Sequence, residues 1–138
     1  MTVRDQPVHY VRPGFILNNI ANPIVTRLGL TPTLTVVGRR SGQRHTNPIG
    51  EPFVFEGGRY LVSGRGETQW ARNLRAAGRC EMRIHRRTER FRVVEITGPD
   101  RLRIVYAWRA ALGHAVDGYF RQIPDEAEHP VFRLEADA

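Results

Sequence analysis

The sequence predicts a small antiparallel β-barrel with helices packed against its outer surface. About six short runs of β-favouring residues recur along the chain, and most of them are joined by turns too short for a crossover. Helical spacing is confined to one segment near the start, one in the middle and one late in the chain. A doubly wound parallel sheet is disfavoured, because each parallel pair of strands needs a crossover connection.

Length and composition predict one domain spanning residues 1–138. The 41% of hydrophobic residues suffices for a core, and the single cysteine, Cys80, cannot form an intramolecular bridge. No run approaches the roughly 18 apolar residues of a membrane-spanning helix. The N-terminus also lacks the apolar core of a signal peptide. We therefore expect a cytoplasmic protein.

The N-terminal region predicts an arm followed by a helix. Residues 1–13 are expected to form a polar arm, because prolines discourage a helix. Residues 14–28 predict an amphipathic helix in which apolar residues recur every four positions, at Ile16, Ile20, Ile24 and Leu28. Pro23 must interrupt it, and Asn22 can cap a restarted turn. Two roles remain open for this segment: packing on the core, or peripheral membrane contact through an interfacial helix.

The next part of the chain predicts strands and tight turns. β-favouring runs occupy 33–37, 51–55 and 60–62. The first run is stopped by Gly38 and by a polar turn that extends to Gln43. The last two are joined by the turn 56–59, where two adjacent glycines are expected to supply positive φ angles.

Helical spacing over 67–77 predicts a short helix that ends at Gly78. Apolar and charged residues then alternate over 80–85 and, less regularly, over 91–95. This alternation predicts two antiparallel strands joined near Arg87-Thr88.

A late helix is expected to begin after a cap residue, Asp100, and to end at Gly113. Its buried face is expected to combine Leu102, Val105, Tyr106, Arg109 and Leu112. Residues 130–134 predict a short last strand.

The charge balance is consistent with an anionic ligand. The net charge is +7, and every basic residue is Arg, whose planar fork suits phosphate and carboxylate groups. A compositional bias of the source genome would leave the same pattern. A nucleic-acid-binding barrel is disfavoured, because the aromatic residues that could stack on bases fall at core positions.

The segment from Gly38 to Pro48 is the first candidate site. Its glycines allow successive N–H groups to point at one spot, and its arginines and Ser41 add charge and a hydroxyl group, which suits a phosphate or carboxylate. Its spacing fits neither a Walker loop nor the dinucleotide fingerprint. A solvated hairpin turn remains the alternative.

The segment from Ser63 to Arg75 is the second candidate site. A glycine-rich loop that leads into a helix presents N–H groups that stabilise an anion. Glu67 and Thr68 can instead cap this helix without a ligand. Trp70 is either a core anchor or a ring-stacking wall.

The motifs of common catalytic centres are absent from the sequence. The five histidines are dispersed and neither HExxH nor CxxC occurs, so we expect no bound metal. Cys80 falls on the apolar side of an alternating strand, which predicts a buried, inert thiol. No GxSxG elbow supports a serine nucleophile. An enzyme of this kind is expected to use an organic cofactor.

Together the two candidate segments resemble the deazaflavin (F420)-dependent nitroreductase family, F420H2-dependent oxidoreductases of split β-barrel fold found chiefly in actinobacteria. The resemblance rests on Gly38-Arg39-Arg40-Ser41-Gly42 followed by Asn47-Pro48, and on Arg65-Gly66-Glu67-Thr68-Gln69-Trp70 followed by Arg72 to Gly78. It covers nearly the whole chain. It implies an FMN-binding-protein-like split barrel, mainly β, with roughly six to seven antiparallel strands and about three outer helices.

The resemblance also implies a cofactor site for reduced deazaflavin, F420H2. The basic loop would hold its phosphate and oligoglutamate tail, Pro48 and Ile49 would line the ring, and the helix carrying Trp70 and Asn73 would close the site. The implied cofactor-binding residues are Arg39, Arg40, Ser41, Gly42, His45, Asn47, Pro48, Ile49, Ser63, Arg65, Gly66, Gln69, Trp70 and Asn73. His45 and Gly50 depart from the family pattern, where many members carry Arg and the best-known members an aromatic residue, respectively.

The activity implied is hydride transfer from the deazaflavin to an electron-poor acceptor such as a quinone, an activated alkene or a nitroaromatic. Tyr119 is the first candidate for proton donor, followed by Tyr106 and His114, with bulk water as the alternative. Two other functions remain open: an FMN-binding oxidoreductase and a non-catalytic F420 carrier. We expect a small-molecule acceptor as partner, no nucleic acid, and either a monomer or a homodimer.

Overall fold

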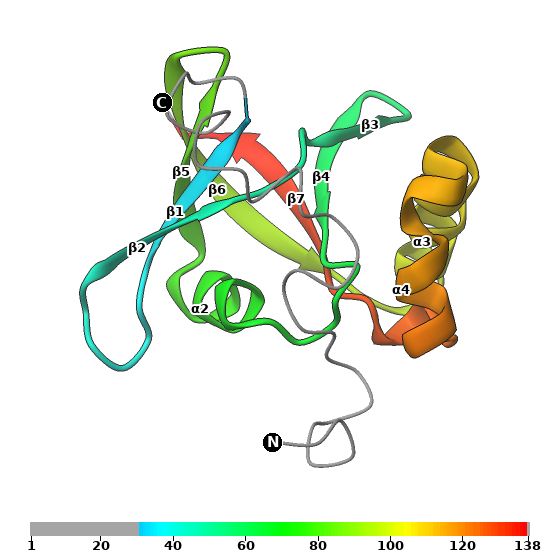
Figure 1. Cartoon of the computed structure of the whole chain (residues 1–138). Coiled ribbons are helices and arrows are strands. Elements are labelled where there is room, and N and C mark those ends of the chain that lie inside the picture. The colour runs from blue at the N-terminus through cyan, green and yellow to red at the C-terminus, as the bar shows by residue number, and fades with distance from the viewer. Residues whose placement is uncertain (1–30, 138) are drawn as a thin grey trace.

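The computed structural model describes residues 31–137, which form a seven-stranded antiparallel sheet in the order β2-β1-β5-β6-β7-β4-β3 (Figure 1). The strands are β1 (Thr33–Val37), β2 (Arg44–Pro48), β3 (Phe53–Phe55), β4 (Gly58–Val62), β5 (Arg79–Ile84), β6 (Arg87–Ile96) and β7 (Val131–Ala136). Each pairing is antiparallel. The predicted fold class is confirmed.

Three α-helices and two short 3-10 helices accompany the sheet within residues 31–137. They are α2 (Gln69–Ala77), α3 (Gly98–Leu112), the 3-10 helix Gly113–Val116, α4 (Asp117–Gln122) and the 3-10 helix Glu126–Glu128. Helix α2 packs beside β1, whereas α3 packs beside β3 and β7 and runs next to α4 (Figure 1). The two helical groups therefore lie on different sides of the strands that connect them.

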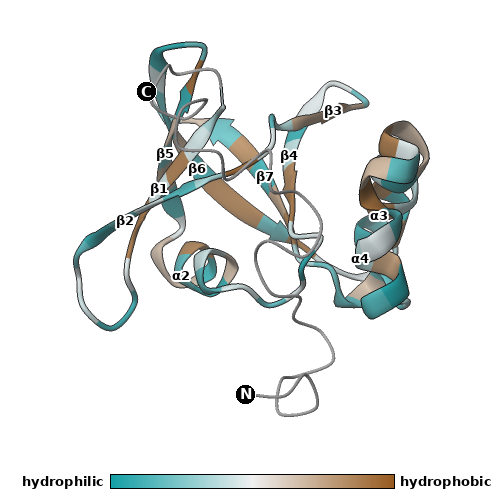
Figure 2. Cartoon of the chain, in the orientation of Figure 1, coloured by the Kyte–Doolittle hydropathy of each residue, from teal (hydrophilic) through white to brown (hydrophobic). Residues whose placement is uncertain are grey.

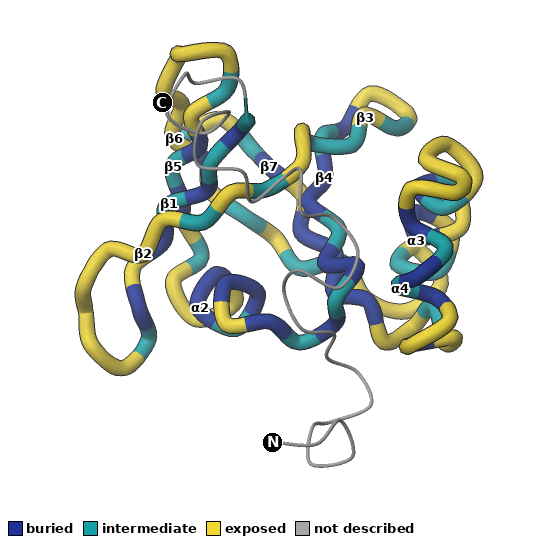
Figure 3. Tube along the Cα trace, in the orientation of Figure 1, coloured by how far each residue is buried: buried dark blue, intermediate teal, exposed yellow. Residues whose placement is uncertain are grey.

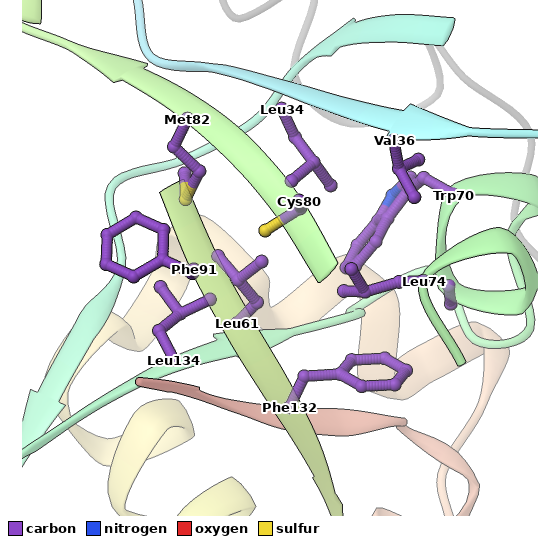
Figure 4. Close-up of a cluster of buried hydrophobic side chains, with 11 residues drawn as sticks. Leu34, Val36, Leu61, Trp70, Leu74, Cys80, Met82, Phe91, Phe132 and Leu134 are labelled. Carbon is purple, nitrogen blue, oxygen red and sulfur yellow. The ribbon is translucent and has the colours of Figure 1, made fainter. Parts of the chain in front are cut away.

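The larger hydrophobic core lies between the curved sheet and α2 (Figure 4). Alternation places Leu34 and Val36 of β1, and Cys80 and Met82 of β5, on the inner face of the sheet. Trp70 from α2 points into the same cluster, so this helix closes one end of the core. Figure 3 shows buried residues on this side of α2 and along β4.

A second hydrophobic cluster joins α3 and α4 to the strands at the other side of the molecule. Its buried members are Tyr60, Ile104, Val105, Trp108, Val116, Phe120 and Val131. Figure 2 shows apolar residues on α3 and on the central strands that separate the two clusters. Burial on both sides fixes the strands between α2 and the α3–α4 pair.

Two predicted turns form with shifted residues. The hairpin between β3 and β4 places its positive φ angles on Glu56 and Gly57, not on two glycines, because Phe55 pairs with Gly58. The β5–β6 turn lies at His85 and Arg86, two residues before the predicted position, and both of these residues have positive φ.

Helix α3 begins earlier and exposes a different face than predicted. Thr97, not Asp100, is its N-cap residue, and Asp100 lies in the first turn. Ile104, Val105 and Trp108 are buried, whereas Tyr106 and Leu112 of the predicted face are exposed. The difference arises because the helix packs on several neighbours, β3, β7 and the two 3-10 helices, rather than along one stripe.

Sequence reasoning missed strand β2 and helix α4. The expected N-terminal arm (1–13) and amphipathic helix (14–28) lie outside the described residues. In the part of the chain that is described, no helix is long and apolar enough to cross a membrane.

Candidate functional site

The first candidate segment forms the turn between β1 and β2. Gly38 donates its N–H to the Gln43 carbonyl oxygen at 2.7 Å, and Gly42 donates to Gly38 at 3.0 Å. Ser41 Oγ lies 3.2 Å from His45 Nε2 and accepts the Gln43 N–H. A Cβ at Gly38 would lie 2.6 Å from His45 Nε2, so a larger residue would push the ring away. The turn is compact, and its Ser41 and His45 side chains are exposed.

Arg39 links this turn to α2 and so brings the two candidate segments together. Its backbone N–H donates to Asn73 Oδ1 at 3.1 Å, and its guanidinium Nη1 donates to the same oxygen at 2.7 Å. Nη1 also donates to Gln69 Oε1 at 3.0 Å. Asn73 is buried, so these contacts fix the turn against the first half of α2.

The second candidate segment is a tight turn followed by a capped helix. Gly66 donates its N–H to the Ser63 carbonyl oxygen at 3.1 Å, and the Ser63 hydroxyl donates to the Gly66 carbonyl oxygen. Thr68 is the N-cap of α2, and its Oγ1 accepts the Ala71 N–H at 3.2 Å. Thr68 therefore caps α2 as predicted.

Glu67 serves an ion-pair network rather than the helix cap. Arg75 donates to both carboxylate oxygens of Glu67 at 2.8 Å and contacts Glu95 at 2.7 Å. These two carboxylates raise the pKa of Arg75 above its ordinary value. Arg75 therefore links the end of α2 to Glu67 just before that helix and to Glu95 of β6.

Trp70 lies in the larger core. Its side chain is 8% exposed, and its ring centroid lies 6.4 Å from that of Phe132. This burial favours the core-anchor alternative over the ring-stacking wall.

Tyr119, the candidate proton donor, lies against the second candidate segment. A Cβ at Gly64 would lie 2.6 Å from Tyr119 Cδ2 and 2.9 Å from Trp108 Cη2. The Tyr119 ring stacks on Trp108 with centroids 6.4 Å apart. Burial raises the pKa of Tyr119, and the positive charge of Arg65 opposes that shift. The hydroxyl group therefore keeps its proton at neutral pH.

The other two donor candidates lie apart from this arrangement. Tyr106 is 56% exposed on α3. His114 is exposed in the 3-10 helix after α3 and contacts Asp117 at 2.9 Å.

The remaining predicted residues lie in the two turns or on the strand β2 and the chain just after it. Asn47 and Pro48 belong to β2 and pair with Leu34 and Thr33 of β1. Ile49 donates its N–H to the Pro32 carbonyl oxygen at 2.9 Å and packs against the larger core. Arg40 is exposed, and Arg65 is half-buried.

Neither metal ligands nor a reactive thiol appear among the described residues. Residues 31–137 contain no cluster of His, Cys, Asp and Glu side chains that could hold a metal ion. Burial raises the pKa of Cys80 to about 12, so its thiol stays protonated and inert at neutral pH.

A hollow with a volume of about 230 Å³ meets the two candidate segments only at Arg44. It is lined by Thr35, Val36, Val37, Arg44, Arg79, Cys80, Glu81, Arg90 and Asp137. Arg44 and Arg90 both pair with Glu81, which lowers the pKa of that carboxyl group. None of the implied cofactor-binding residues lines this hollow.

His129, which sequence reasoning missed, is a buried polar residue next to the site. It is 0% exposed, and its ring nitrogens lie near the carbonyl oxygens of Ser63 and Ile123. A lone histidine before a proline carries no spacing signal, so only its three-dimensional contacts identify it.

A family model matches most of the chain. The model of the F420H(2)-dependent quinone reductase family matches residues 18–132. No curated protein matches the chain.

Solved structures with the same fold are similar at low sequence identity. A structure of an F420-H2 dependent reductase has a TM-score of 0.56 at 19% identity, covering 75% of this chain and 92% of that one. An FMN-binding, pyridoxamine 5'-phosphate oxidase-related protein from Nostoc punctiforme has a TM-score of 0.53 at 13% identity, covering 87% and 76%. A structure described as a domain-swapped dimer has a TM-score of 0.56 at 19% identity, covering 75% and 78%. These likenesses agree with a split-barrel fold.

Proposed function

Because the chain belongs to the F420H2-dependent quinone reductase family, we propose that it reduces a small electron-poor acceptor, a quinone, an activated alkene or a nitroaromatic, with F420H2. The observation that carries this proposal is the contact of Arg39 with Asn73 at 2.7 Å. This contact joins the two segments on which the family resemblance rests. They would then form one site rather than two separate turns.

The residues of the joined turns fit a cofactor that carries a phosphate and several carboxylates. Arg39, Arg40 and Arg65 supply guanidinium groups, and Ser41 adds an exposed hydroxyl group. Among the described residues, a Cβ at Gly50 would meet nothing within 4 Å, so there is open space where the chain leaves β2. When bound, F420H2 would supply the hydride.

The protein's own contribution would be to bind, orient and protonate. The basic turn would neutralise the charge of the cofactor, and the rigid contact of this turn with α2 would limit the entropy lost on binding. Tyr119 would donate a proton from its hydroxyl group, which burial keeps protonated. Arg65 would favour any transient tyrosinate.

Fluorescence titration of the protein with F420, FMN and FAD side by side tests the cofactor. We expect micromolar or tighter binding of F420 and none of FMN. Preferential FMN binding would instead establish the FMN-binding oxidoreductase. F420 binding without turnover of any acceptor would establish the carrier.

We further infer a homodimer. The likeness to a structure described as a domain-swapped dimer supports it. Light scattering coupled to gel filtration is expected to give twice the chain mass of 15.8 kDa. A single-chain mass at every concentration would contradict this inference.

Peripheral membrane contact through residues 14–28 stays a prediction.

A further inference from the structure

His129 bridges two parts of the proposed site. The residue lies between the 3-10 helix Glu126–Glu128 and β7, and its side chain is 0% exposed. Its Nε2 lies 2.9 Å from the carbonyl oxygen of Ile123, the C-cap of α4. Its Nδ1 lies 3.3 Å from the carbonyl oxygen of Ser63, the first residue of the turn that precedes α2. One ring therefore faces both the candidate cofactor turn and the end of the helix that carries Tyr119.

The backbone next to His129 holds the turn as well. Ser63 donates its N–H to the Pro130 carbonyl oxygen at 2.8 Å. Ser63 also accepts the Gly66 N–H, so the position of its carbonyl group sets the shape of the turn. The segment 129–130 is thus attached to Ser63 through Pro130, whichever ring nitrogen of His129 carries the proton.

The other end of the bridge reaches Tyr119. A carbonyl oxygen only accepts hydrogen bonds, and a neutral imidazole donates through one nitrogen. The tautomer protonated at Nε2 donates to Ile123, the shorter of the two contacts. Ile123 in turn donates its N–H to the Tyr119 carbonyl oxygen at 2.8 Å. The His129 ring also packs on Phe120, with ring centroids 4.5 Å apart.

We propose that His129 is a positioning residue for the proposed reaction, which ties the Ser63–Gly66 turn to α4 and thereby fixes Tyr119 over Gly64. This inference rests on the proposed function. The tie matters because the Tyr119 ring packs on Gly64 without room for a Cβ, so a small shift of α4 would move this ring away from the turn.

Three substitutions separate the two contacts of the ring. His129→Phe keeps an aromatic ring beside Phe120 and removes both nitrogens. His129→Gln places an amide N–H near the position of Nε2 and can still reach Ile123, whereas His129→Asn places it near Nδ1 and cannot. We expect His129→Phe and His129→Asn to lower kcat by about three- to tenfold, and His129→Gln to restore most of it.

A double-mutant cycle with Tyr119→Phe distinguishes positioning from a merely structural role. If His129 acts through Tyr119, His129→Phe lowers kcat in the wild-type background and has little further effect in the Tyr119→Phe background. An equal loss in both backgrounds, or wild-type kcat in folded His129→Phe protein, would overturn the proposal. Should His129→Phe fail to fold, the His129→Gln and His129→Asn pair carries the same comparison.

Hydrogen exchange on the cofactor-free protein gives an independent readout. We expect the Ile123 and Gly66 amides to exchange faster in His129→Phe than in the wild type. The amides of the buried Cys80–Phe91 pair of β5 and β6 report global stability, and the increase at Ile123 and Gly66 should exceed the increase at this pair. An unchanged exchange rate at Ile123 would show that His129 does not hold α4. Absence of F420 binding by the wild type would instead contradict the proposed function, and the exchange rates would still show whether His129 holds α4.

Discussion

Replacing Arg39 with Ala is expected to weaken F420 binding by about 10- to 100-fold, as measured by fluorescence titration. A hydrogen bond to a charged group contributes about 1.5–3 kcal/mol, and each 1.4 kcal/mol corresponds to about tenfold in Kd. The substitution also removes the guanidinium contacts to Asn73 and Gln69, which hold the β1–β2 turn on α2. Both effects act in the same direction.

Arg83→Ala is the matched control. Arg83 is an exposed arginine on β5, outside both candidate segments, and its loss lowers the net charge by the same amount. We expect its F420 affinity to stay within about twofold of the wild type, because distant exposed charges are screened by salt. Equal weakening in both variants would mean that F420 responds to net charge alone. Wild-type affinity in Arg39→Ala would remove the basic turn from the proposed site.

Tyr119→Phe is expected to lower turnover with F420H2 by about 100-fold, since a positioned general acid contributes about 10²- to 10⁴-fold. The substitution removes only the hydroxyl group and leaves the ring stacked on Trp108 and packed on Gly64. Affinity for F420 should therefore change little. Turnover is measured by single-turnover and steady-state rates, and affinity by fluorescence titration, on the same preparations.

The pH profile gives a second readout for Tyr119. Burial raises its pKa above the ordinary value of 10.0, so the hydroxyl group is protonated from neutral pH up to that value. Wild-type turnover that depends on this proton should be level through neutral pH and fall only at strongly alkaline pH. Tyr106→Phe, at an exposed position on α3, is the control and should retain full activity. Wild-type turnover in Tyr119→Phe would assign protonation to bulk water.

Sequence reasoning succeeded where a local pattern carried the structure. The alternation through Cys80 and Met82 predicted β5 and its buried thiol, and the change of spacing before Gly78 predicted α2, whose C-cap is that glycine. It failed at β2, because four of the five residues from Arg44 to Pro48 are exposed and none is a strong apolar marker. Pairing with β1 across the turn, rather than burial, defines that strand.

The candidate site divides in the same way. The two segments that make up the site could be predicted, because glycine, arginine and hydroxyl residues at close spacing suit an anion whatever the surrounding fold. Their contact could not, since Arg39 and Asn73 are 34 residues apart and meet only after β1 and α2 pack together. His129 and Ser63 are 66 residues apart, and their contact depends on β7 pairing with β4.

The sequence by itself determined the antiparallel fold class, the two anion-suited segments and the resemblance to deazaflavin-dependent reductases. Only the tertiary structure decided that the two segments meet at Arg39, that Trp70 lies in the core, and that Tyr119 packs on Gly64 beside a buried histidine. The physical reason is that turn chemistry and side-chain alternation are local properties of the chain. Long-range contacts, in contrast, depend on how the sheet curves and on which helix covers each side of it.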